Sequence, residues 1–90
     1  MIKIVNKKFV IKDEAGLHAR PASILCSAAS KYAGEIDIIY QEKRYTLKSI
    51  MILMSLGVPQ GGEITIEAQG EGEQEILDTL TGILEEHRLV

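Results

Sequence analysis

The stretch Gly16-Leu17-His18-Ala19-Arg20-Pro21-Ala22 marks the point where a strand ends and a helix begins. Proline is tolerated only in the first turn of a helix, so Pro21 predicts a helix start near Ala19. This places His18 at or beside the N-cap. Histidine caps helices poorly compared with Ser, Thr, Asp or Asn, so capping does not explain this residue.

The position of His18 suggests phosphoryl chemistry. Unpaired N–H groups and the positive end of the helix dipole favour an anion and disfavour an imidazolium, so we expect a neutral, nucleophilic ring. Gly16 permits a backbone conformation that turns the ring outward. Arg20 adds a guanidinium suited to phosphate oxygens. Such a site could accept a phosphoryl group and hand it on without a metal or other cofactor, because a partner protein could complete the positioning.

Simpler interpretations of these residues stand beside this one. By residue type alone, a histidine at a helix start is most often an exposed loop residue. A metal site is disfavoured, because His18 and His87 lie far apart in the sequence and one cysteine cannot complete a tetrahedral set. Cys26 has no context of an activated nucleophile and fits a buried helix stripe, so we interpret it as a core residue.

Hydrophobic periodicity outward from this stretch predicts seven elements. Positions 5, 9 and 11 share one parity in a first strand, whereas Ile2 and Ile4 have the opposite parity and are expected to slip register or leave the sheet. Ala22, Leu25, Cys26 and Ala29 form the stripe of a helix ending at 32–34. The remaining elements are strands over 35–41 and 44–47, a short helix over 49–56, a strand after 61–62, and an amphipathic helix over 73–88. The turn at 41–42 lacks the Gly or Asn that tight hairpins prefer.

The element order βαββαβα predicts an α+β fold. Strands with one apolar face favour an antiparallel sheet covered by a single layer of helices, an open-faced sandwich. A chain of 90 residues is expected to form one domain over 1–90. Ferredoxin-like and RNA-binding folds share this order, so the function must come from the sites.

Composition and charge exclude some classes of function. No apolar run approaches the roughly 18 residues of a membrane span, and lysines interrupt the N-terminus, so we expect a cytoplasmic protein without membrane insertion. Residues 1–48 carry nine Lys/Arg and five Asp/Glu, and residues 49–90 carry one and eight. This asymmetry favours a basic-leaning face for an acidic partner. Direct nucleic-acid binding is disfavoured, because no dense basic cluster is interleaved with aromatic residues.

Two motifs resemble a known family. The stretch 16–22, together with Lys48-Ser49-Ile50-Met51 running into Met54-Ser55-Leu56-Gly57, resembles HPr, the histidine-containing phosphocarrier of the bacterial sugar phosphotransferase system. The resemblance extends from about Lys8 to Glu86. It implies a sheet of strand order 1-4-2-3 with three helices on one face. It also implies that His18 accepts phosphate on Nδ1 from phospho-enzyme I and passes it to enzyme IIA domains, with Arg20 assisting, so that the protein is a relay rather than an enzyme.

Ser49 has a structural and a regulatory interpretation. Serine is a favoured N-cap, which alone explains the residue. A phosphoserine would also be stabilised at a helix start. The resemblance implies phosphorylation by HPr kinase/phosphorylase, with a catabolite-control transcription factor as a further candidate partner. A regulatory paralogue acting mainly through Ser49 in carbon catabolite repression is the alternative to the transport relay.

A partner surface is expected around these two sites. An eight-residue helix packed on one side cannot bury all its apolar residues, so an exposed methionine-bearing patch is predicted. With residues of the preceding helix it would form the docking face for enzyme I and IIA domains. The predicted members are Ala19, Arg20, Ser23, Ser27, Ile50, Met51 and Met54.

Overall fold

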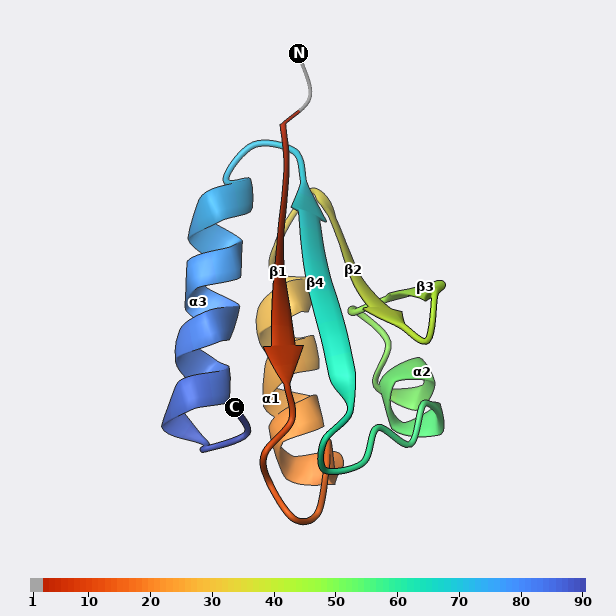
Figure 1. Cartoon of the computed structure of the whole chain (residues 1–90). Helices are drawn as coiled ribbons and strands as arrows, with labels where there is room; N and C mark the ends of the chain where they lie inside the picture. The colour runs from red at the N-terminus through yellow and green to blue at the C-terminus, as the bar shows by residue number, and fades with distance from the viewer. Residues whose placement is uncertain (1–2) are drawn as a thin grey trace.

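The computed structural model describes residues 3–90 and has the predicted element order (Figure 1). The strands are β1 (Ile4–Val10), β2 (Glu35–Tyr40), β3 (Lys43–Thr46) and β4 (Glu63–Gln69). The helices are α1 (Ala19–Ser30), α2 (Ile50–Ser55) and α3 (Glu73–Glu86). No helix in this part of the chain is long and apolar enough to cross a membrane.

The four strands form one antiparallel sheet of order β1-β4-β2-β3, which confirms the expected topology. Apolar residues lie opposite one another across the ladder: Ile64 pairs with Phe9 on one side, and Ile66 pairs with Ile38 on the other. The central strands β4 and β2 therefore hold the apolar face of the sheet in register. The edge strands β1 and β3 are paired on one side only.

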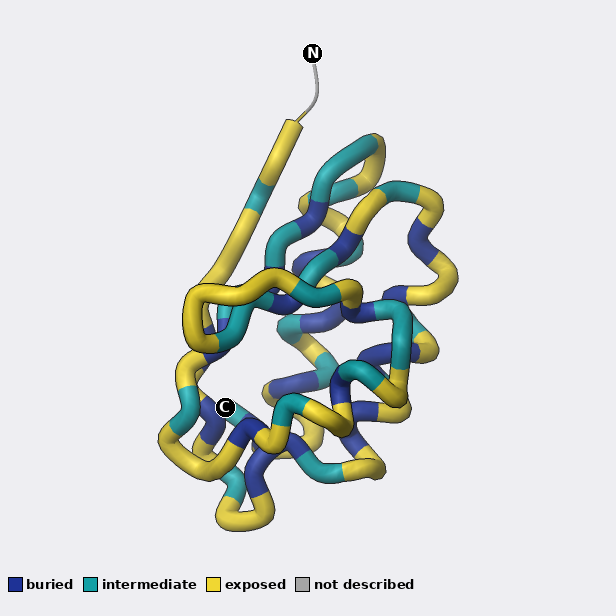
Figure 2. Tube along the Cα trace, turned by 90° about the vertical axis from the view of Figure 1, so that its right-hand side faces the viewer, coloured by how far each residue is buried: buried dark blue, intermediate teal, exposed yellow. Residues whose placement is uncertain are grey.

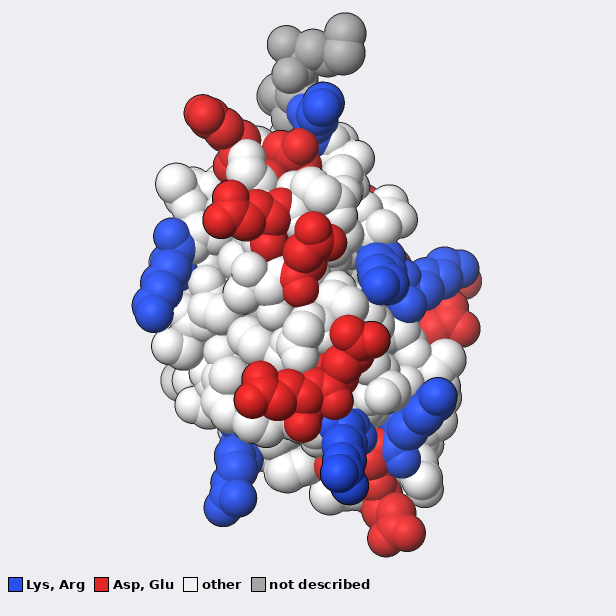
Figure 3. Space-filling view, turned by 90° about the vertical axis from the view of Figure 1, so that its left-hand side faces the viewer, with Lys and Arg blue, Asp and Glu red and all other residues white. Residues whose placement is uncertain are grey.

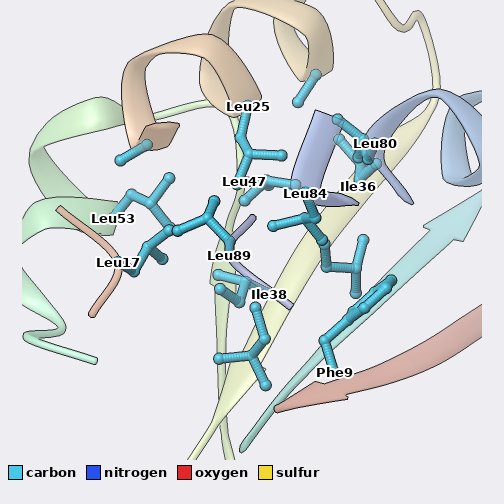
Figure 4. Packing of buried hydrophobic residues seen from close by; sticks show 14 of the residues in the cluster. Phe9, Leu17, Leu25, Ile36, Ile38, Leu47, Leu53, Leu80, Leu84 and Leu89 are labelled. Atoms are coloured by element: carbon cyan, nitrogen blue, oxygen red, sulfur yellow. The ribbon is translucent and has the colours of Figure 1, made fainter. Parts of the chain in front are cut away.

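One hydrophobic cluster joins the sheet to the helices. Alternate strand residues and the predicted helix stripes are buried, and Figure 2 shows these positions recurring along the tube. All three helices lie on the same face of the sheet, and α1 contacts both α2 and α3. Figure 4 shows Leu17, from the loop before α1, and Leu53, from α2, pointing into the same core. The core therefore fixes the start of α1 relative to α2.

The N-terminal expectation was wrong for Ile4. This residue lies within β1 and pairs with Gln69, although 54% of its surface is exposed. Backbone pairing with β4 holds the strand in register even where the apolar parity fails. Ile2 lies outside the described residues.

The two longer helices end before their predicted limits. Helix α1 ends at Ser30 rather than Tyr32. Helix α3 ends at Glu86 because Arg88 adopts a left-handed conformation with φ 56°, and the N–H of Leu89 donates to the carbonyl of Leu84 at 2.9 Å. This closure returns the fully buried Leu89 to the core.

The basic and acidic residues do not divide into two faces as cleanly as residues 1–48 and 49–90 divide by charge. Figure 3 shows acidic side chains spread over the face that carries α3. On the sheet, Asp37 lies opposite Glu67, and Arg44 donates to both carboxylates. Its hydrogen bond to Glu67 is the main cause that raises the pKa of Arg44. This arginine therefore neutralises the sheet surface rather than contributing to a basic face.

The β2–β3 hairpin offers a test of local backbone strain. Gln41 and Glu42 form its two-residue loop with φ 51° and 67°, the signs of a type I′ turn. Replacing both residues, Gln41→Asn with Glu42→Gly, should raise the free energy of unfolding by about 1–2 kcal/mol. The reason is that asparagine and glycine adopt the left-handed conformation with less strain than glutamine and glutamate. Urea denaturation measures this effect, and an unchanged or lower midpoint would contradict it.

Candidate functional site

A tightly bonded loop positions His18. The N–H of Gly16 donates to the Asp13 carbonyl at 2.9 Å, and the N–H of Leu17 donates to the Val58 carbonyl at 2.9 Å. Gly16 has φ +67°, and a Cβ at this position would lie 2.3 Å from the Val58 carbonyl oxygen. Glycine is therefore required here both by the backbone conformation and by the close approach of the 58–59 segment.

His18 is the N-cap residue of α1, as predicted. Its backbone is extended, its side chain makes no capping hydrogen bond, and its carbonyl accepts the N–H of Ala22 at 3.1 Å. Among the described residues, the N–H groups of Ala19 and Arg20 find no acceptor, and Pro21 has no N–H. The side chain of His18 is 41% exposed. The arrangement therefore offers an accessible imidazole beside two free helix-start donors.

The structure adds a residue that the sequence interpretation missed. Asp13 Oδ2 lies 3.5 Å from His18 Nε2, while Asp13 Oδ1 accepts the N–H of Ala15 at 2.8 Å. An aspartate just before a turn is a signal for an Asx turn, but the sequence does not indicate that the second oxygen faces the imidazole.

Arg20 is exposed, and its guanidinium makes no hydrogen bond or ion pair with any described residue. Five N–H donors therefore remain available for the oxygens of an anion. The imidazole of His18, the free N–H groups of Ala19 and Arg20, and the Arg20 guanidinium all belong to residues 18–20. Such a set can stabilise a phosphoryl group that arrives on the ring.

Ser49 is the N-cap of α2, which confirms its predicted place in the fold. Its Oγ accepts the N–H of Ile52 at 3.3 Å. The neighbouring Lys48 Nζ donates to the carbonyls of Tyr32 at 2.6 Å and Gly34 at 2.9 Å. The Lys48 ammonium thus links the loop before α2 to the loop between α1 and β2. It makes no hydrogen bond to Ser49.

Comparison with known proteins identifies the family. Residues 5–86 match the family described as "PTS HPr component phosphorylation site". The chain belongs to the HPr family. This is a family of phosphocarriers of the phosphotransferase system rather than of enzymes that turn over a substrate.

Solved HPr-family structures are similar over nearly their full length. The histidine-containing phosphocarrier protein of a Mycoplasma is 38% identical, with a TM-score of 0.92 over 96% of this chain and 98% of that chain. A phosphocarrier protein HPr from Bacillus anthracis is 34% identical, with a TM-score of 0.80 over 89% and 95%. Crh, the catabolite repression HPr of Bacillus subtilis, is 39% identical, with a TM-score of 0.63 over 88% and 94%.

The surface predicted for partners is exposed in this HPr-family chain. Helix α2 presents Ile50, Met51 and Met54 with 38%, 81% and 39% of their surfaces accessible. Helix α1 presents the exposed residues Ala19, Arg20, Ser23 and Ser27. We call these seven residues the α1/α2 face. Ser23 and Ser27 also line a groove between α1 and α3 that reaches Ile83, so this part of the face borders α3.

No metal centre is formed by the described residues 3–90, since no three His, Cys, Asp or Glu side chains gather closely enough to hold an ion. Cys26 is buried with a free thiol, in the helix stripe where the pattern placed it.

Substitution of Ser49 tests its capping role. Ser49→Ala should lower the free energy of unfolding by about 1 kcal/mol, because the Ile52 N–H loses its acceptor. Ser49→Asp should retain most of the wild-type stability, since aspartate caps as well as serine. Urea denaturation of both variants measures the difference. Equal destabilisation by alanine and aspartate would contradict the assigned cap.

Proposed function

We propose that this chain carries a phosphoryl group on Nδ1 of His18, accepts it from phospho-enzyme I and passes it to enzyme IIA domains of sugar permeases. The observation that carries the proposal is the accessible imidazole at the N-cap of α1, followed by two N–H groups and a guanidinium that have no partner among residues 3–90. Membership of a phosphocarrier family supports the same conclusion.

The geometry suits a reversible transfer. The lone pair of His18 Nδ1 forms the N–P bond while the bond between phosphorus and the donor breaks, and the donor keeps that electron pair. The helix-start N–H groups and the Arg20 guanidinium stabilise the charge on the phosphoryl oxygens. Because 41% of the His18 side chain is accessible, a second protein can approach the ring and take the group onward.

The α1/α2 face is the proposed docking surface for enzyme I and IIA domains. Its flexible, polarisable methionines adapt to partners of different shape, which suits a relay with several partners. We further propose that residues 1–90 act as one domain, because one hydrophobic cluster receives residues from β1 through to Leu89. We also propose that the chain acts in the cytoplasm, which is the typical location of HPr-family proteins.

Regulation through Ser49 is the second candidate function. Ser49 lies at the start of α2, where the negative charge of a phosphate is tolerated, and Crh proteins are among the relatives. HPr kinase/phosphorylase would modify Ser49, and a catabolite-control transcription factor would bind the modified form. In the alternative form of this proposal, the chain acts mainly through Ser49.

Phosphorylation assays separate the two functions. With phosphoenolpyruvate and enzyme I, the wild type and Ser49→Ala should gain one acid-labile phosphoryl group, which mass spectrometry maps to His18. His18→Ala should gain none. With HPr kinase/phosphorylase and ATP, an acid-stable phosphate should appear on Ser49 in His18→Ala and be absent from Ser49→Ala.

Equal acid-labile labelling of His18→Ala and the wild type would overturn the relay. Efficient labelling of Ser49 with slow or absent turnover at His18 would favour the regulatory paralogue. Transfer of the label from the phosphorylated wild type to an isolated IIA domain tests the onward step.

A further inference from the structure

The carboxylate of Asp13 lies between the loop backbone and the imidazole of His18. Its Oδ1 accepts the N–H of Ala15 at 2.8 Å, and its Oδ2 lies 3.5 Å from His18 Nε2. The carbonyl of Asp13 also accepts the N–H of Gly16 at 2.9 Å. The loop therefore holds this carboxylate in one orientation and directs its second oxygen to the ring.

A carboxylate accepts hydrogen bonds and cannot donate one, whereas each nitrogen of a neutral imidazole either carries a proton or has a lone pair. An acceptor beside Nε2 stabilises the tautomer with the proton on Nε2. The lone pair is then on Nδ1. We propose that Asp13 is a positioning residue that selects this tautomer of His18 and so prepares Nδ1 to receive the phosphoryl group. The inference rests on the proposed function.

The charge balance of the transfer gives Asp13 a second effect. When the Nδ1 lone pair forms the bond to phosphorus, the proton stays on Nε2, and the ring gains a formal positive charge. The phosphorylated donor loses its bond to phosphorus and keeps the electron pair. Asp13 Oδ2 faces the Nε2 end of the charged ring and stabilises it. Onward transfer returns the electron pair to Nδ1.

An asparagine in place of Asp13 should preserve the loop and place a hydrogen-bond donor, instead of an acceptor, beside His18 Nε2. In Asp13→Asn, the amide oxygen can still accept the Ala15 N–H, while the NH2 group faces Nε2 as a donor. A donor at Nε2 favours the tautomer with the proton on Nδ1, which has no lone pair for phosphorus. Glu14→Gln removes the same charge from the neighbouring exposed residue and is the matched control.

The test is 15N NMR of the unphosphorylated protein at a pH where the ring is neutral. A His87→Gln background leaves His18 as the only imidazole. We expect mainly the Nε2–H tautomer in the wild type and Glu14→Gln, and a shift toward Nδ1–H in Asp13→Asn. The rate of phosphoryl transfer from phospho-enzyme I should fall about tenfold in Asp13→Asn alone. Unchanged backbone amide shifts would establish that the variant is folded.

The same tautomer in the wild type and Asp13→Asn would overturn the inference, even if His18 is phosphorylated normally. A tautomer shift in a protein that acquires no phosphate on His18 would instead support the role of Asp13 and contradict the proposed function. A rate loss in Asp13→Asn without a tautomer shift would also overturn the inference, because it would indicate a loop effect alone.

Discussion

Replacing Arg20 by alanine is expected to slow phosphoryl transfer to and from His18 by about 100-fold. Arg20 lies two residues after His18 in the first turn of α1, and its guanidinium has no partner among the described residues. Its charge can therefore be directed at the phosphoryl oxygens rather than at the fold. Rapid-quench kinetics with phospho-enzyme I measures the rate.

Two controls separate charge from geometry in this experiment. Arg20→Lys keeps the positive charge but loses the planar fork of donors, so its rate should lie between those of the wild type and Arg20→Ala. Lys31→Ala removes an exposed cation from the other end of α1 and should leave the rate unchanged. Equal rates for Arg20→Ala and Lys31→Ala would contradict a local role for Arg20.

Replacing Gly16 by alanine is expected to lower the free energy of unfolding by about 2–3 kcal/mol. The new Cβ would lie 2.3 Å from the Val58 carbonyl oxygen, at a residue with φ +67°. The 58–59 segment must then move away, which weakens the hydrogen bond from Leu17 to Val58. Because this loop carries His18, phosphoryl transfer should fall as well. Urea denaturation and the transfer assay measure the two effects.

Gly57→Ala is the matched control for Gly16→Ala. Gly57 has a similar φ of +61°, but a Cβ at this position meets nothing within 4 Å. Its substitution should cost about 1 kcal/mol or less, because only the backbone preference is violated. Similar losses in both variants would show that the close approach to Val58 does not constrain the loop.

The fold was predictable because its apolar pattern is regular. Ile36 and Ile38 in β2 and Ile64 and Ile66 in β4 alternate, so a period-two pattern places them on one buried face. The residues at which the helices end were harder to predict from the sequence. Arg88 ends α3 in a left-handed conformation that residue type does not suggest. Gln41 and Glu42 also adopt left-handed conformations in the β2–β3 turn, although tight hairpin turns prefer Asn and Gly at these positions.

The candidate site was predictable only in part. Pro21 indicates a helix start, and that indication places His18 at the N-cap. The contact between Asp13 and the ring depends on how the loop folds back over five residues, which local pattern does not determine. Likewise, Lys48 belongs to a recognisable motif, but its bonds to the carbonyls of Tyr32 and Gly34 arise from tertiary packing.

Nδ1 of His18, at the start of α1, is the atom that we propose carries phosphorus. The most direct test is 31P and 15N NMR of the chain after phosphorylation by enzyme I and phosphoenolpyruvate, with 15N-labelled histidine. We predict one 31P signal coupled to Nδ1 of His18, and none from His87. A signal coupled to Nε2 of His18 or to His87, or the absence of any phosphohistidine signal, would contradict the assignment of Nδ1 of His18.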